Sequence, residues 1–234
     1  MRRAAILVAA LAAGPVAAEV ITGVEFTNPT TRYPHGVLGD AVEWGGYRAV
    51  LDTGIYAMAL PQSHVFEDIA PRLWDVTGDG APEIVVVETD VEAGAALAIY
   101  GPRGKLAETP HIGQRNRWLA PVGAADLDGD GHVEIAYVDR PHLAKTLRIW
   151  RFVEGALEPV VDVEGLTNHR IGEDFITSGL RDCGTGPELV TVDASWSHLM
   201  VTRAEGGRWL SYPVTPFTGP ASLADVLACE AGAG

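Results

Sequence analysis

Short apolar runs recur along the chain, and each is bounded by turns that are rich in glycine and acidic residues. The clearest runs are 84–87, 135–138 and 189–192, where β-branched and aromatic side chains dominate. A run of about four such residues between turn signals predicts a buried strand, because a helix repeats its apolar residues every three to four positions. No stretch after residue 20 has a convincing helical period. The pattern therefore predicts an all-β chain.

These strand-like runs form a repeated unit. Each buried run is followed, after a polar turn, by a second run, and most units then add a glycine turn and a further run. The second runs are 56–60, 97–100, 147–150 and 199–202, and the further runs begin at Gly104, Gly155 and Gly207. Three or four strands joined by tight turns are the content of one antiparallel propeller blade. The repeat predicts a small β-propeller, with a non-closing stack of hairpins or a sandwich as the alternative.

The turn before the run at 135–138 carries oxygen-bearing side chains in a regular order. Its first, third, fifth and ninth positions are Asp126, Asp128, Asp130 and Glu134. Calcium binds six to eight oxygen atoms and mixes carboxylates, backbone carbonyls and water. Alternate residues of a tight turn point inward, and the intervening glycines permit the positive φ that the turn requires. The spacing predicts a calcium-binding loop, and the strand that follows it directly distinguishes this loop from an EF-hand.

Three other segments share this frame and have lost acidic residues to different degrees. The best preserved copy carries its oxygen donors at Asp75, Thr77, Asp79 and Glu83. In the copy at 180–188, Leu180 replaces the first acid; in the copy at 40–48, Arg48 stands at the ninth position. The first positions are 35, 51 and 54 residues apart, and a partial fifth frame begins at Asp225. We therefore expect metal binding only at the loops that begin at Asp75 and Asp126.

The acidic core 126–135 resembles the calcium-binding core of FG-GAP/VCBS repeats, a family that includes the β-propeller of integrin α-subunits and many secreted bacterial proteins. The resemblance extends over residues 33–225 as a degenerate repeat. It implies a propeller in which each calcium loop joins two strands of a blade. By position it implies that the calcium ligands are Asp126, Asp128, Asp130 and Glu134, and Asp75, Thr77, Asp79 and Glu83. Because the family's usual ring has more repeats, we expect four or five blades, closed by pairing of the N- and C-terminal strands, or an open assembly.

The N-terminus has the features of a targeting segment. Arg2 and Arg3 precede the apolar run 4–13, and small residues follow at 16–18. This is the order of a secretory signal peptide, and the run is too short to span a bilayer. We expect cleavage near Ala18 and a periplasmic or secreted protein with one propeller-like domain at 19–234. Its predicted repeat units are 33–66, 67–117, 118–172 and 173–216, with a partial closing unit at 217–234.

The net charge limits the classes of binding partner, and the cysteine content indicates the redox state of the compartment. The net charge is −14, or about −16 without the two arginines of the signal peptide. Such an acidic chain is not expected to bind nucleic acid or an anionic membrane. The two cysteines, Cys183 and Cys229, are predicted to form one disulfide, in keeping with an oxidising compartment.

Motifs for catalysis are not evident. The sequence has no Gly-x-Ser-x-Gly elbow, His-Glu-x-x-His helix, P-loop or dinucleotide-binding fingerprint. Ser63–His64 and Ser197–His198 are adjacent pairs, and neighbours in a strand point to opposite faces, so neither is predicted to act as a nucleophile and its base. The histidines at 111, 142 and 169 are expected on surface loops.

We therefore expect a non-enzymatic, calcium-stabilised protein whose loop faces bind a protein or a glycan. A propeller-based hydrolase or lyase, or an accessory domain of an envelope enzyme, is the alternative. A purely structural envelope component fits the same sequence. Acids and histidines converging in a deep central pocket would favour the enzyme.

Overall fold

The computed structural model describes residues 19–231, which form antiparallel sheets and one short helix. The strands in chain order are β1 (Ile21–Thr30), β2 (Glu43–Leu51), β3 (Gly54–Ala59), β4 (His64–Phe66), β5 (Arg72–Trp74), β6 (Glu83–Asp90), β7 (Gly94–Gly101), β8 (Gly104–Glu108), β9 (Leu119–Ala125), β10 (Glu134–Asp139), β11 (Thr146–Val153), β12 (Ala156–Glu164), β13 (Leu166–Thr167), β14 (Gly179–Asp182), β15 (Pro187–Asp193), β16 (His198–Glu205) and β17 (Arg208–Pro216). Helix α1 (Pro220–Leu227) follows the last strand. The predicted β-rich repeat is confirmed.

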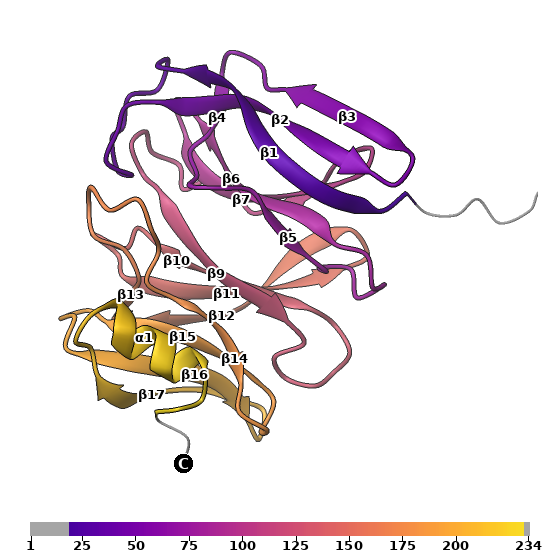
Figure 1. The fold of residues 1–234 in the computed structure, drawn as a ribbon. Helices are drawn as coiled ribbons and strands as arrows, with labels where there is room; N and C mark the ends of the chain where they lie inside the picture. Colours follow the sequence, from indigo (N-terminus) through magenta and orange to yellow (C-terminus); the bar gives the residue numbers. More distant parts are fainter. Residues whose placement is uncertain (1–18, 232–234) are drawn as a thin grey trace, which may run out of the picture.

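The strands form three sheets that follow one another along the molecule in chain order. Strands β1 to β8 form an eight-stranded sheet, β9 to β12 a four-stranded sheet, and β13 to β17 a five-stranded sheet. In Figure 1 the first sheet lies at the top in indigo and magenta, and the last lies at the bottom with α1 in orange and yellow. The short strands β4 and β5 both pair with β6, and β13 and β14 both pair with β15.

Apolar clusters join each group of strands to the next. The first sheet curls so that the rings of Tyr47 on β2 and Tyr100 on β7 lie 5.4 Å apart. Val85 and Val87 on β6 share a cluster with Ile135 on β10. Two further clusters connect β10 and β11 with β15, and β15 and β16 with α1. Burial on both faces of the central strands accounts for their continuous apolar runs.

The predicted pairing of the two chain ends is wrong. Strand β1 pairs with β2 along its length, and the segment after residue 219 forms α1 instead of a closing strand. Pro220 lies at the start of this helix, a position where its missing N–H costs nothing, and Val226 is fully buried. Eight residues are too short a stretch for a helical period to stand out in the sequence. A closed ring and a blade number stay predictions.

The loop at 31–42, between β1 and β2, connects the first and last groups of strands instead. The Gly172 N–H donates to the carbonyl of Val37 at 3.0 Å. Gly39 approaches so closely that a Cβ there would lie 2.8 Å from the Gly172 carbonyl oxygen. Figure 1 shows the corresponding orange loop after β13 reaching up toward the indigo loop. We call residues 31–42 the crossing loop.

The sequence frame at 40–48 is also wrong. Strand β2 begins at Glu43, so Arg48 lies in the middle of that strand, opposite Glu25, with an Arg48 Nη1 to Glu25 Oε1 distance of 2.9 Å. Strand β1, which the predicted repeat left without a unit, is the partner of β2. The frame failed because the crossing loop is longer than the acidic loops farther along the chain.

The predicted disulfide between Cys183 and Cys229 is present, with Cα atoms 5.6 Å apart. It ties the turn after β14 to the second residue after α1, so it holds a helix rather than a strand. The predicted signal peptide at 1–18 lies outside the described residues. Within residues 19–231, no helix is long and apolar enough to cross a bilayer.

Candidate metal centre

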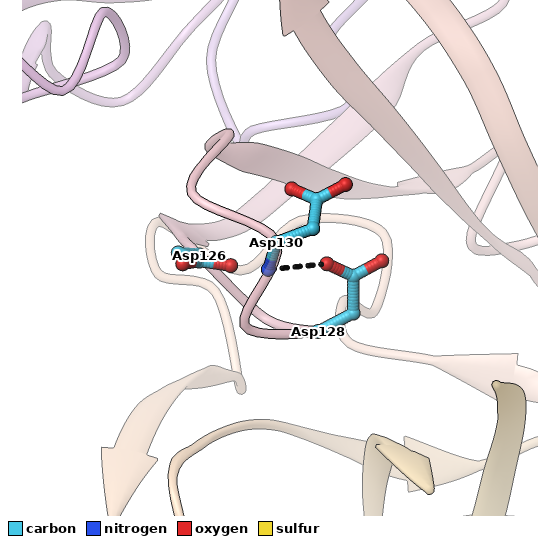
Figure 2. Close-up of side chains that lie close together, drawn as sticks. All are labelled: Asp126, Asp128 and Asp130. Atoms are coloured by element: carbon cyan, nitrogen blue, oxygen red, sulfur yellow. Dashed lines mark hydrogen bonds between the residues drawn. The ribbon is translucent and has the colours of Figure 1, made fainter. Parts of the chain in front are cut away.

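The acidic loop joins β9 to β10 and brings three of its carboxylates together. Ligand atoms of Asp126, Asp128 and Asp130 all lie within 4.8 Å of one another, the only such group of three or more in residues 19–231. Figure 2 shows the loop curving past these side chains, with the Asp130 N–H donating to Asp128 Oδ1 at 3.2 Å. The loop is therefore shaped so that its acids converge.

Asp126 fixes the backbone of this loop. Its two carboxylate oxygens accept N–H bonds from Gly129 at 2.7 Å and Gly131 at 3.0 Å. Both glycines have positive φ, 80° and 90°, which side chains other than glycine rarely tolerate. The alternation of acid and glycine in the sequence thus has a direct structural cause.

Glu134 lies beside this group but does not join it. It is the first residue of β10 and fully buried, and its Oε2 accepts the N–H of Leu127 at 2.8 Å. Burial raises the pKa of Glu134, and its hydrogen bonds to Arg151 and the Leu127 N–H oppose that rise. In this structure Glu134 positions the start of the loop, whereas the sequence assigned it as a ligand.

Arg151 supplies positive charge to the loop. It lies on β11 opposite Glu134, with its Nε 2.6 Å from Glu134 Oε1 and its Nη1 2.7 Å from Asp130 Oδ2. Its Nη2 also contacts Asp128. Sequence reasoning missed Arg151, because its role depends on the pairing of β10 with β11. The signal available was the presence of two arginines, Arg148 and Arg151, within an otherwise apolar strand.

The convergent group fits a hard cation. It offers only carboxylate oxygens, which calcium prefers, and two of its three acids are exposed to water that could complete the coordination. A cation at Asp128 and Asp130 would compete with the guanidinium of Arg151. The arginine therefore acts as a built-in counter-charge for the loop.

The second predicted loop, between β5 and β6, has the same hydrogen-bond skeleton without the arginine. Asp75 accepts the N–H groups of Gly78 and Gly80 at 2.8 and 2.9 Å. Glu83 accepts the N–H groups of Val76 at 2.8 Å and Thr77 at 3.2 Å. Ile84 pairs with Tyr100, which brings Gly101 opposite Glu83. The predicted donors Asp75, Thr77, Asp79 and Glu83 thus share one loop, but their acids do not form a convergent group.

The copy at 180–188 needs a corrected register. Arg181 pairs with Glu188 as Ala125 pairs with Glu134, so the segment equivalent to 126–133 is 182–187, which is two residues shorter. Its first acid is Asp182, which accepts the N–H groups of Gly184 at 2.8 Å and Gly186 at 3.2 Å. The first acid has therefore been kept, and the deletion has removed the later ones.

Arginines neutralise the buried glutamate of this shortened loop. Arg181 Nε lies 2.8 Å from Glu188 Oε2, and Arg203 Nη1 lies 2.8 Å from Glu188 Oε1. Arg203 occupies the position that Arg151 holds in the Asp126 loop. The Arg181 guanidinium also donates to the carbonyl of Val226 in α1 at 3.1 Å.

The two adjacent serine–histidine pairs were expected to point to opposite faces of a strand, but in each pair the side chains contact each other. The hydroxyl of Ser63 lies 2.9 Å from His64 Nδ1, and that of Ser197 lies 2.9 Å from His198 Nδ1. Each histidine is the first residue of its strand and each serine precedes it in a turn, so the opposite-face rule does not apply. Both serines are exposed on the surface.

Comparison with known proteins agrees with the loop geometry. A search of curated proteins found no match. Residues 75–137 match the sequence model of the FG-GAP-like repeat family. The match begins at Asp75, the first acid of the loop between β5 and β6. It ends in β10, after the Asp126 loop. This chain carries an FG-GAP-like repeat.

Proposed function

We propose that this protein is a periplasmic or secreted, non-enzymatic FG-GAP-like repeat protein that calcium stabilises through the loop at 126–134. The observation that supports calcium most directly is the convergence of Asp126, Asp128 and Asp130 within 4.8 Å. The loop joins two paired strands of the four-stranded sheet, so its order determines how β9 meets β10. The exposed faces of such loops are then available to a protein or glycan partner.

Calcium would act on folding through the repulsion between these acids. Three carboxylates held this close repel one another, and Arg151 offsets only part of that repulsion. A cation that binds the folded loop and not the unfolded chain adds its binding free energy to stability, about 2.7 kcal/mol at a concentration one hundred times the Kd. For a domain of this size such a gain raises the melting temperature by roughly 5–10 °C.

The experiment is a melting curve of metal-free protein with chelator and with added calcium. Calcium should raise the melting temperature of the wild type, and Asp130→Asn should abolish most of that rise. Asp174→Asn, a change at an exposed acid outside the loop, should keep it. Equal melting temperatures in chelator and calcium for the wild type would refute the calcium role.

Secretion is the second part of the proposal. The run 4–13 behind Arg2 and Arg3 supports a cleaved signal peptide, and the disulfide supports an oxidising compartment. Terminal sequencing of the protein from a periplasmic fraction should begin near Glu19. Recovery of a chain that begins at Met1 in the cytoplasm would contradict it.

The enzyme alternative has one observation in its favour. Glu67 and the histidines at 35, 142 and 169 gather at the end of the strands opposite the metal loop. This gathering supports a ligand site more directly than a reaction.

A further inference from the structure

A pocket opens at the end of the molecule opposite the Asp126 loop. Asp139 pairs with Leu119, so the residues just before β9 and just after β10 meet at this end. The pocket has a volume of about 280 Å³ and includes Arg117, Trp118, Arg140 and His142 among its lining residues. The crossing loop contributes His35 and Val37. Segments from distant parts of the chain thus build one site.

The charge of the pocket wall is opposite to that of the chain. No aspartate or glutamate is among the lining residues in the described part of this chain of net charge −14. Arg140 is bound to Asp139, with 2.9 Å between Nε and Oδ1. Arg148 shares the same carboxylate at 3.0 Å and also binds Asp162 at 3.1 Å, so these two arginines are balanced by two acids. Arg117 donates to the backbone carbonyl of Asn116 at 2.7 Å. Within residues 19–231 Arg117 has no ion pair with an aspartate or glutamate, so its guanidinium is the positive charge of the wall that favours an anionic ligand.

His35 is held by a buried carboxylate behind the wall. Its Nδ1 contacts Glu67 Oε1, and the other oxygen of Glu67 accepts the hydroxyl of Thr89 at 2.7 Å. The backbone carbonyl of Glu67 also accepts the indole N–H of Trp118 at 2.7 Å. Since Nδ1 donates to Glu67, Nε2 is the ring nitrogen left for a ligand.

His142 is held by a second histidine, and the contacts determine its tautomer. The carbonyl of Glu173 can only accept, so His169 Nε2, 2.9 Å away, must donate to it. In neutral His169 the Nδ1 is then an acceptor, and His142 Nε2, 2.9 Å from it, is the donor. Burial, followed by the nearby His169 and His35, lowers the pKa of His142 to about 4, so it is neutral near pH 7. Its Nδ1 is left as a bare acceptor.

Two exposed apolar side chains border the opening. Leu143 is 64 % exposed and Ile171 is 71 % exposed, although both are large and hydrophobic. They lie beside Trp118 and Val37, which are buried at the base. The pocket is at the small end of the range for ligand sites, which suits a molecule of one sugar-ring size.

We propose that this pocket binds a small hydroxylated carboxylate. Its carboxylate meets Arg117. One of its hydroxyl groups donates to the Nε2 of His35, which is the acceptor nitrogen when Nδ1 donates to Glu67. Another hydroxyl group donates to the Nδ1 of His142. Its carbon skeleton lies against Leu143 and Ile171. Such a ligand is either a free hydroxy acid or a terminal uronic acid residue of an acidic saccharide. This inference specifies the partner in the proposed binding role and rests on that role, but it does not depend on calcium.

The test is calorimetric titration of the full mature protein with four small probes. D-glucuronate represents the saccharide source and D-gluconate the free hydroxy acid. D-glucose lacks the carboxylate, and cyclohexanecarboxylate lacks the hydroxyl groups. At least one of the first two should bind about tenfold or more tightly than either of the last two, because each lacks one charged or hydrogen-bonded contact. The tighter of the two acids identifies the source.

Two variants and one spectroscopic signal locate the binding. Arg117→Gln should weaken binding about tenfold, whereas the matched change Arg208→Gln on the distant strand β17 should leave it unchanged. In the wild type, the ring nitrogen NMR signals of His35 and His142 should shift during the titration. This signal needs no variant that could fail to fold.

Equal affinity for glucuronate, gluconate and glucose, or no binding of either acid at tens of millimolar, would show that the histidine network serves structure alone. Unchanged histidine signals in the presence of bound acid would place the ligand elsewhere and overturn the proposal. Either failure would leave the calcium-dependent melting temperature intact. Failure of the calcium role would conversely leave acid binding intact.

Discussion

The Asp126 loop and the Asp182 loop connect equivalent strands, yet they stabilise a buried glutamate by different means. The first loop spans residues 126–133, gathers three acids and has one arginine opposite Glu134. The second spans 182–187 and has two arginines on Glu188, with a disulfide beside it. What the two share is a compensated glutamate at the start of the second strand. In both loops an arginine on the neighbouring strand contacts that glutamate; the first loop adds converging acids to this arrangement, and the second adds a further arginine.

The largest expected effect comes from the buried pair of the Asp182 loop. Arg181→Leu leaves Glu188 buried with only Arg203, which should lower the free energy of unfolding by about 3–5 kcal/mol. Urea unfolding measures this change. The matched variant Arg203→Gln removes a partly exposed partner and should cost about 1 kcal/mol. If both variants cost the same, burial of Arg181 is not what holds this loop.

The disulfide should rank second. Cys183→Ser together with Cys229→Ser releases a loop whose ends are 46 residues apart, which should cost about 2–4 kcal/mol. A reductant should produce the same loss in the wild type. Because the disulfide lies at the Asp182 loop and not at the Asp126 loop, the calcium response of the melting temperature should persist. Loss of that response would show that the two loops are coupled.

Arg151→Met probes the counter-charge of the Asp126 loop. Without the guanidinium, the three acids and Glu134 repel one another, so stability in chelator should fall by about 1–2 kcal/mol. Calcium affinity should rise several-fold, because the competing cation has gone. Arg148→Met, on the same strand but paired with Asp139, is the control and should not alter calcium affinity. Weaker calcium binding in Arg151→Met would mean that the arginine supports the metal instead of replacing it.

A pH-dependent effect is expected at Glu43, the first buried glutamate of the described chain. Burial, followed by Glu67, Asp40 and Asp68, raises the pKa of Glu43 to about 9. The folded protein therefore holds a proton that the unfolded chain has lost above about pH 4.5. The stabilising contribution is complete below that pH and disappears as the pH rises toward 9.

Glu43→Gln removes this proton-linked contribution. The melting temperature should then fall less steeply between about pH 5 and pH 8, a difference of about 1–3 kcal/mol in the free energy of unfolding. Burial also raises the pKa of Glu67, which is present in both proteins. Glu158→Gln on an exposed strand position is the control and should keep the wild-type slope. A slope unchanged by Glu43→Gln would indicate an ionised Glu43.

Local patterns in the sequence predicted the strands and the Asp126 loop because both depend on neighbouring residues. The β-branched runs and the alternation of acid and glycine are both visible in consecutive residues of the sequence. The frames at Leu180 and Arg48 failed because they assumed one loop length, whereas the segment equivalent to 126–133 is 182–187 in one copy and the loop before β2 is 31–42 in the other. Strand register is set by contacts that a fixed spacing does not describe.

The site was predicted in part for the same reason. Three of the four acids in the Asp126 loop converge as expected, but the partner of Glu134 on β11 required knowledge of pairing. The His35–Glu67 contact joins the crossing loop to the residue after β4. Neither histidine of the pocket has a sequence neighbour that would have marked it.

The crossing loop also has a consequence for the order of folding. Its contact with Gly172 joins two positions near opposite ends of the chain, so the first strands cannot reach their final environment until the last group of strands has formed. Contacts of such long sequence separation slow folding. A chain truncated before residue 166 would leave Val37 without its partner. We therefore expect the three sheets to unfold together, and a chain shortened by one unit to be less stable.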